Sequence, residues 1–156
     1  MIARAGRGAL NPRQKGQNMK YYLAYGSNLN KRQMKTRCPD AVPVGSCVVK
    51  DYELVFRGVA TIEPNPGAEV PCGIWKISKG DEAALDRYEG YPRLYVKQDF
   101  RVKVNGKTIT AMAYVMTDGI RPLSPPSTSY LLTIAEGYDD FGLDDKPLSI
   151  AATRRE

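Results

Sequence analysis

The chain has 156 residues, a formal net charge of +6 and no histidine. That length suits one domain that buries about two thirds of the surface exposed by its unfolded chain. The absence of histidine excludes a Ser-His-Asp triad, a Cys-His pair and any His-containing metal site. No stretch reaches the roughly 20 apolar residues of a membrane span, so we expect no membrane partner.

The positive charge is concentrated at the start of the chain. Residues 1–18 hold no acidic side chain and these basic ones: Arg4, Arg7, Arg13 and Lys15. Residues 19–156 are nearly neutral, which argues against a nucleic-acid partner. The Gly/Arg/Asn-rich start lacks an apolar signal-peptide core and predicts disorder. We expect a disordered basic extension over residues 1–18, as a leader, a cloning remnant or an upstream-start extension, and a single domain over residues 19–156.

The cysteines indicate the redox compartment. Cys38, Cys47 and Cys72 are odd in number and lack CxxC spacing. This pattern favours reduced, mostly buried thiols over a disulfide framework or a zinc site. We therefore expect a cytoplasmic protein.

The first half of the chain is dominated by strand signals. Lys20–Tyr25 predicts the first strand, and Lys31–Arg37 predicts a short helix that Pro39 stops. Val42–Val49 and Tyr52–Phe56 alternate apolar and polar residues, as half-buried strands do.

A predicted hairpin and a predicted helix follow. Ala60–Ile62 and Val70–Ile77 flank the turn-rich segment EPNPGAE, which predicts a hairpin at that segment. Ser78 with Asp81 three residues later fits a capping box, so a helix is expected over Lys79–Tyr88.

The second half predicts one more hairpin and then helices. Tyr95–Val104 and Lys107–Met116 are strands joined by Asn105-Gly106, a strong hairpin signal. After a proline-rich loop, the apolar spacing in Ser129–Tyr138 predicts a helix. Pro147–Glu156 forms a short surface helix or frays. Many antiparallel strands with few helices favour an α+β fold with a closed or nearly closed sheet.

The segment YLAYGSNL, residues 22–29, is the most informative of the chain. A strand stops there in a turn that leaves backbone N–H groups free to bind an anion. Gly26 allows positive φ and close approach of a ligand, while Ser27 and Asn28 add short polar side chains. Asn28 or Asn30 can cap the next helix. The alternative is a plain strand-to-helix turn.

The segment LDRYEGYPRLY, residues 85–95, supplies a candidate acid–base group. Glu89 is expected at the negative end of a helix that Gly90 terminates. Desolvation by Tyr88, Tyr91 and Tyr95 would raise the pKa of the carboxyl as well. A glutamate with a raised pKa suits general base catalysis, although a solvated helix-end glutamate is the alternative.

Together, these segments resemble the gamma-glutamylcyclotransferase-like family, whose members carry a YGSN-type turn and a glutamate in an LDxxEG segment. Tyr114–Asp118 resembles the last barrel strand of that family, Pro125 and Pro126 its proline loop, and Tyr130 its substrate-contacting tyrosine. The similarity runs from about residue 19 to about residue 143. It implies a small mixed, mostly antiparallel β-barrel, with flanking helices and a cavity at one end.

The resemblance also implies a reaction, in which the α-amine of a γ-glutamyl group attacks its own γ-carbonyl and releases 5-oxoproline. The substrate supplies the nucleophile, so no metal or other cofactor is expected. Glu89 is implied as the catalytic proton carrier, while backbone N–H groups of the glycine turn bind the oxyanion or the α-carboxylate. The implied substrate-binding residues are Tyr22, Leu23, Ala24, Tyr25, Gly26, Ser27, Asn28, Tyr95 and Tyr130.

Several questions stay open at the level of sequence. The leaving group is an amino acid, an amine or a carrier, and Arg93 either reads an acidic leaving group or is solvated. The partner is a small γ-glutamyl molecule, and the protein is a monomer or a weak homodimer. Two alternatives are a non-catalytic module that binds a small anion on the same barrel, and an interaction protein whose basic extension tethers nucleic acid or an anionic surface.

Overall fold

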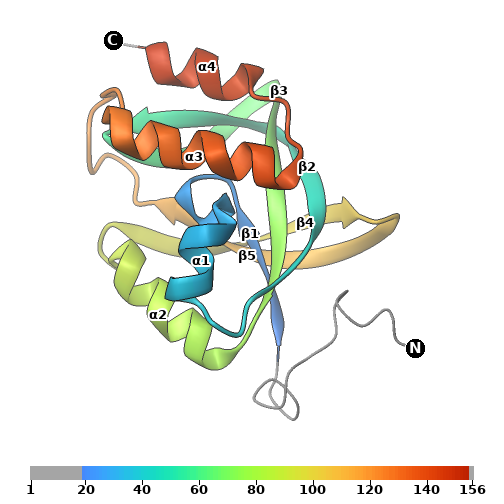
Figure 1. The fold of residues 1–156 in the computed structure, drawn as a ribbon. Coiled ribbons are helices and arrows are strands. Elements are labelled where there is room, and N and C mark those ends of the chain that lie inside the picture. Colours follow the sequence, from blue (N-terminus) through green and yellow to red (C-terminus); the bar gives the residue numbers. More distant parts are fainter. Residues whose placement is uncertain (1–18, 155–156) are drawn as a thin grey trace.

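A computed structural model of the protein describes residues 19–154. The expected basic extension over residues 1–18 lies outside the described residues. The described chain folds into one mixed sheet with helices packed outside it, as Figure 1 shows. In that view α3 and α4 lie above the level of α2, with α1 between α2 and α3.

The sheet has five strands in the order β2-β3-β1-β5-β4. Their bounds are Lys20–Ala24 for β1, Val42–Arg57 for β2, Val59–Ile77 for β3, Tyr95–Val104 for β4 and Lys107–Met116 for β5. All neighbours are antiparallel except β1 and β5, which are parallel at Tyr22 and Met112. The expected α+β class with a mixed, mostly antiparallel sheet is confirmed.

The sheet is open, so the term barrel holds only loosely. β2 and β4 are its outer strands, and no backbone ladder joins them within the described residues. Side chains bridge the seam instead. Gln98 Nε2 donates to Tyr52 Oη at 3.0 Å, and the Tyr52 ring meets the Phe100 ring edge-on at 5.2 Å. The sheet is therefore curled and nearly closed, and side-chain contacts at Tyr52 join part of the seam.

The prediction of a hairpin turn at EPNPGAE was wrong. The chain reverses at Gly58, whose φ is 81°, and β3 then runs on through the prolines. Residues 65–68 stand opposite Asp51 alone, because the register shifts between Lys50 and Tyr52. The Gly67 N–H donates to Asp51 Oδ1 at 2.9 Å within this irregularity. Proline and glycine thus form a bulge inside a long strand, a position that tolerates both.

The first two α-helices begin where the sequence predicts. α1 spans Lys31–Arg37 and is capped by Asn30, whose side chain accepts the Gln33 N–H at 3.0 Å. α2 spans Lys79–Glu89 and opens with the predicted capping box. The remaining helical elements are η2, a single 3-10 turn over Ser27–Leu29, with α3 over Thr128–Phe141 and α4 over Lys146–Thr153.

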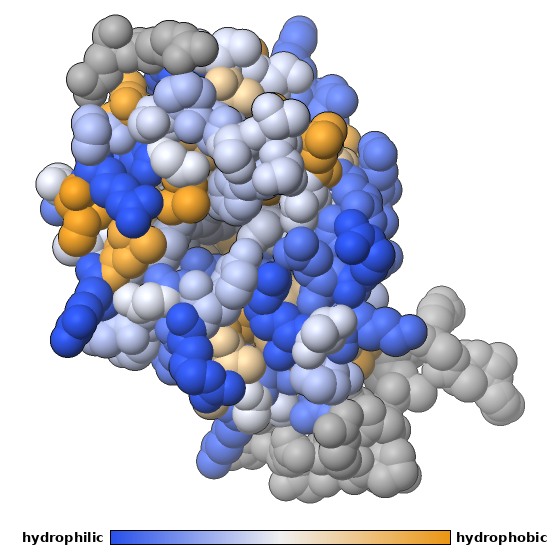
Figure 2. Space-filling model, turned by 60° about the vertical axis from the view of Figure 1, so that its left-hand side comes forward, coloured by the Kyte–Doolittle hydropathy of each residue, from blue (hydrophilic) through white to orange (hydrophobic). Residues whose placement is uncertain are grey.

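One connected core lies between the sheet and the helices. Leu23, Leu29, Ile74 and Ile134 are completely buried in it. The cysteines are free and buried, as the sequence predicted, and Cys47 stands directly opposite Cys72 on the neighbouring strand. No helix in residues 19–154 is long and apolar enough to cross a bilayer. On the face shown in Figure 2, hydrophobic residues form small groups separated by hydrophilic ones.

Glycine allows α3 to approach the start of the chain very closely. A Cβ atom on Gly137 would lie 2.6 Å from Leu29 Cβ and 2.8 Å from the backbone nitrogen of Asn30. Real Cβ contacts are longer, so only glycine lets α3 press against this turn. Asn30 Nδ2 also donates to the Thr133 carbonyl of α3 at 3.0 Å. The segment after β1 is thereby held against α3.

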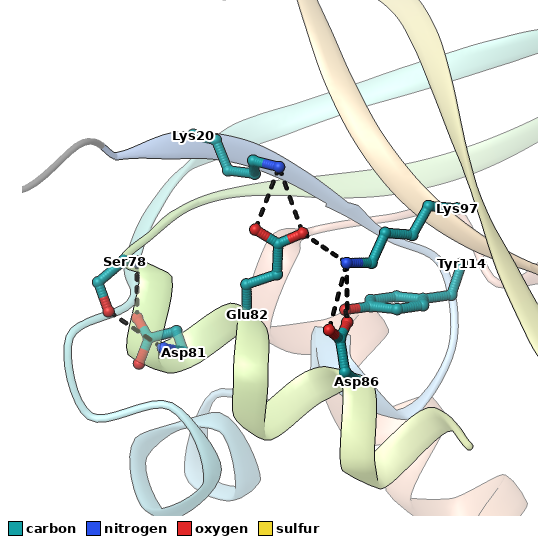
Figure 3. A network of polar contacts seen from close by, with 7 residues as sticks. All are labelled: Lys20, Ser78, Asp81, Glu82, Asp86, Lys97 and Tyr114. Atoms are coloured by element: carbon teal, nitrogen blue, oxygen red, sulfur yellow. Dashed lines mark hydrogen bonds and ion pairs between the residues drawn. The ribbon is translucent and has the colours of Figure 1, made fainter. Parts of the chain in front are cut away.

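A polar network fixes α2 on the sheet, as Figure 3 shows. Glu82 accepts from Lys20 of β1 at 3.3 Å and from Lys97 of β4 at 2.8 Å. Asp86, one turn later, pairs with Lys97 at 3.1 Å and accepts from Tyr114 Oη of β5 at 2.6 Å. These contacts join three strands to one face of α2. They set the direction in which the helix delivers its last residue, Glu89.

Candidate active site

A cavity of about 290 Å³ lies where η2, α2, α3 and the strands β1, β3, β4 and β5 meet. It is lined by Tyr22, Tyr25, Gly26, Ser27, Asn28, Val59, Ala60, Tyr88, Glu89, Leu94, Tyr95, Tyr114 and Tyr130. The volume suits a small molecule, and the walls are largely aromatic with a few polar groups. Glu89 is the acidic residue of the lining.

Gly26 forms part of the cavity surface without the left-handed conformation expected for it. Its φ is −126°, so that expectation was wrong. What requires a small residue there is space. A Cβ atom would point toward Ala60 and Tyr130, at 3.4 Å from Ala60 Cβ and 3.7 Å from Tyr130 Oη. Glycine therefore leaves the backbone accessible from the cavity between these two residues.

The turn after Gly26 presents unused donors. Its first internal hydrogen bond is made by the Leu29 N–H to the Gly26 carbonyl at 3.0 Å. The N–H groups of Gly26, Ser27 and Asn28 come before that bond, as at any helix start. Trp75 Nε1 donates to the Asn28 carbonyl at 3.0 Å and holds the turn from behind. The donors are thus fixed in place at the cavity.

Glu89 is the last residue of α2 and enters the same cavity. Gly90 follows it with φ 68°, which ends the helix as predicted. Asn28 Nδ2 donates to Glu89 Oε2 at 2.9 Å, so the glycine turn and the glutamate touch. Burial raises the pKa of Glu89 to about 7, although nearby Arg37 and the Asn28 hydrogen bond act to lower it. Tyr91 is not part of the surrounding wall and is 39% exposed.

The hydroxyls of Tyr95 and Tyr130 both form hydrogen bonds with the backbone of Ala60, which lines the cavity. Tyr130 Oη accepts the Ala60 N–H at 3.0 Å, while Tyr95 Oη donates to the Ala60 carbonyl at 2.5 Å. Tyr130 therefore still has its O–H free to donate, and the hydroxyl of Tyr95 can still accept. Burial raises the pKa of both tyrosines, so they stay protonated near neutral pH.

The structure brings together most of the residues predicted for the site. The exceptions are Leu23 and Ala24, which are buried in β1 and do not line the cavity. Lining residues outside the predicted set are Val59, Ala60, Tyr88, Leu94 and Tyr114. Tyr88 and Tyr114 belong to the quoted motifs, whereas no local signal marks Ala60. Arg93 is exposed and lies outside the lining.

The protein is thus a small α+β domain whose cavity holds one glutamate, Glu89, among tyrosines. The glycine turn at Gly26 lies beside this glutamate. A family model described as "Gamma-glutamyl cyclotransferase, AIG2-like" matches residues 22–133, which contain both. This match covers well over half of the chain, and the protein therefore belongs to that family.

Particular relatives agree with this assignment. The gamma-glutamylcyclotransferase of Bos taurus is 35% identical over 136 residues, covering 78% of this chain and 71% of its own. The human protein of the same name is 34% identical over the same coverage. A solved structure titled gamma-glutamyl cyclotransferase superposes with a TM-score of 0.78 at 30% identity, over 88% of this chain and 89% of its own. Bacillus subtilis YkqA, at 21% identity, shares the fold with a TM-score of 0.74 over 92% of this chain and 58% of its own.

Proposed function

We propose that the protein is a cofactor-independent cyclotransferase that releases 5-oxoproline from a γ-glutamyl amino acid or γ-glutamyl amine. The observation that carries the proposal is the contact between Asn28 Nδ2 and Glu89 Oε2, at 2.9 Å on the wall of a cavity lined by tyrosines. It joins a proton carrier with a pKa of about 7 to a turn rich in backbone donors. The names of the relatives support the same reaction class.

In the proposed reaction Glu89 moves protons between two nitrogen atoms of the substrate. The α-ammonium group gives a proton to the ionised carboxylate, and its nitrogen attacks the γ-carbonyl carbon. The bond from that carbon to the leaving nitrogen then breaks. Both protons lost from the α-ammonium group end on the leaving amine, the first of them by way of Glu89. A pKa near 7 suits a group that both accepts and returns a proton at neutral pH.

Charge develops on the carbonyl oxygen when the ring closes. The N–H groups of Gly26, Ser27 and Asn28 and the free O–H of Tyr130 are the donors available in the same cavity. One subset would bind the substrate α-carboxylate and another the oxyanion. The folded glutamyl chain would be held between them by the tyrosine rings, which favours ring closure by restricting its conformations.

The rival reading is a module that binds a small anion without catalysis. A carboxylate inside the cavity disfavours an anion without a cationic group. A γ-glutamyl compound has such a group, because its α-ammonium can pair with Glu89. We therefore prefer the cyclotransferase, acting on a small-molecule partner in the cytoplasm as a monomer or weak homodimer.

The test is a panel of γ-glutamyl compounds that differ only in the leaving group: amino acids, amines and a carrier peptide. Mass spectrometry would follow 5-oxoproline formed by the wild type, by Glu89→Gln and by Glu136→Gln. Glu136 is a surface glutamate of α3 paired with Arg32 at 2.7 Å, so its variant controls for a lost carboxylate. We expect product from the wild type and Glu136→Gln, and at least a 100-fold slower rate from Glu89→Gln. Absence of product across the panel would refute the proposal.

A further inference from the structure

Arg37, the last residue of α1, does not line the cavity but contacts two residues that do. Its Nη1 donates to Asn28 Oδ1 at 2.5 Å. Its guanidinium carbon lies 3.6 Å from the centre of the Tyr88 ring. Its Nη2 donates to Gln33 Oε1 at 3.1 Å, one turn earlier on α1. The guanidinium is thus held on three sides.

The contact with Asn28 settles which way its amide faces. Oδ1 accepts from Arg37, while Nδ2 donates to Tyr22 Oη at 2.8 Å and to Glu89 Oε2 at 2.9 Å. A guanidinium can only donate. If the amide were rotated by half a turn, its NH₂ would meet Arg37 and its oxygen would meet the Glu89 carboxylate. Both contacts would then be repulsive, so Arg37 stabilises the orientation in which Asn28 donates to Glu89.

The contact with Tyr88 holds a second part of the wall. Tyr88 precedes Glu89 and is 45% exposed, so little else covers its outer face. Its hydroxyl lies 3.0 Å from Ser27 Oγ, which ties it to the glycine turn. A guanidinium above the ring is attracted to the electron-rich face of the aromatic system. Arg37 therefore braces α2 against the turn from outside the cavity.

The charged and titratable groups around Glu89 come from every element that packs near it. They are Arg37 of α1, Tyr22 of β1, Tyr25 after β1, Tyr88 of α2, Tyr95 of β4, Tyr114 of β5 and Tyr130 of α3. Burial raises the pKa of most of these tyrosines, so their hydroxyls stay neutral near pH 7: Tyr22, Tyr25, Tyr95, Tyr114 and Tyr130. Among these groups Arg37 carries the positive charge, and it lowers the pKa of Glu89 against the larger effect of burial.

We propose that Arg37 is a positioning residue, which acts on Glu89 through the Asn28 amide and the Tyr88 ring. The expected effect of Arg37 on the reaction rate rests on the proposed function. Its effect on the geometry and ionisation of Glu89 does not. These two claims are tested separately.

The first test is a titration of the Glu89 carboxyl carbon by NMR, with the signal assigned by its loss in Glu89→Gln. In Arg37→Met we expect the midpoint to rise above about 7 by about one pH unit. We also expect the two Asn28 side-chain amide protons to shift. Arg37→Lys keeps the charge but cannot reach Asn28, Gln33 and the ring together, so its midpoint should change less while the amide protons still shift.

The matched control is Arg32→Met on the same helix. Arg32 pairs with Glu136 on the surface and has no contact with the cavity, so its variant should titrate like the wild type. If Arg37→Met does not fold, Gln33→Ala loosens the same guanidinium without removing it, and should shift the Asn28 signals. Unchanged midpoint and amide signals in the folded Arg37 or Gln33 variants would overturn the proposal.

The second test compares kinetics on a substrate that the wild type turns over. We expect Arg37→Met to lower kcat by about tenfold, to move the acid limb of kcat/KM upward with the NMR midpoint, and to change KM by less than about threefold. A purely structural role would lower the amount of folded enzyme without moving the limb, and would count against the proposal. If no panel compound reacts, the proposed function fails while the NMR result still decides the role of Arg37.

Discussion

Asn28 and Glu89 are 61 positions apart in the chain, and the Asn28 side chain donates to the Glu89 carboxylate at 2.9 Å. Asn28 belongs to a turn held by Trp75 and α3, while Glu89 ends a helix that Figure 3 shows anchored to three strands. Both are therefore carried by rigid elements. A site built in this way keeps its geometry without a ligand.

The pH dependence of turnover should follow Glu89. Its pKa is raised to about 7 by burial, and only the ionised carboxylate can accept the substrate proton. We expect kcat/KM to fall about tenfold for each pH unit below the midpoint. The measurement is a kcat/KM profile from pH 5 to about 9. A rate that stays constant down to pH 5 would exclude Glu89 as the base.

The same residue should make the protein less stable as the pH rises. Glu89 binds its proton more tightly when folded, with a pKa of about 7 against 4.5, so folding is favoured while the group is protonated and that advantage is lost between these values. Glu89→Gln removes the effect. The quantity to compare is the free energy of unfolding of Glu89→Gln minus that of the wild type. This difference should be about 2 kcal/mol larger at pH 8 than at pH 5. Urea unfolding of both proteins at pH 5 and pH 8 measures this difference. The same difference in unfolding free energy at both pH values would contradict the prediction.

Gly26→Ala should impair binding more than folding. The added methyl group would meet Ala60 at 3.4 Å and Tyr130 at 3.7 Å, which are tolerable contacts, but it would occupy the cavity between them. We expect a stability loss of about 1 kcal/mol or less and a fall in kcat/KM of about tenfold or more. Thermal unfolding and steady-state kinetics on the same sample measure both. Unaltered kinetics would mean that the substrate does not approach this wall.

Gly137→Ala should impair folding. Its methyl group would lie 2.6 Å from Leu29 Cβ and 2.8 Å from a backbone nitrogen, which cannot move aside cheaply. Overpacking of this kind costs about 1–3 kcal/mol. The control is Gly80→Ala near the start of α2, where a Cβ has its nearest neighbour at 3.8 Å and helix propensity favours alanine. Equal unfolding free energies for the two variants would refute the close approach of α3.

Much of the secondary structure followed from short-range chemistry. The Asn30 cap, the Ser78 capping box and the Asn105-Gly106 hairpin each involve neighbours in the chain, and each was found as predicted. Asn105 and Gly106 have the positive φ values, 51° and 76°, that such a turn demands. The EPNPGAE segment failed as a hairpin because prolines and glycines suit bulges as well as turns, and only strand pairing distinguishes the two.

The chemistry of the candidate site was present in the sequence, because a glycine turn after a strand and a glutamate at a helix end are both local patterns. Their contact was decided by the tertiary structure, as was the convergence of Tyr95 and Tyr130 on the backbone of Ala60. Arg37 had no local signal, since its partners Asn28 and Tyr88 come from other elements. Local propensities place groups along a chain, whereas the packing of α1, α2 and α3 around the curled sheet determines which of those groups meet.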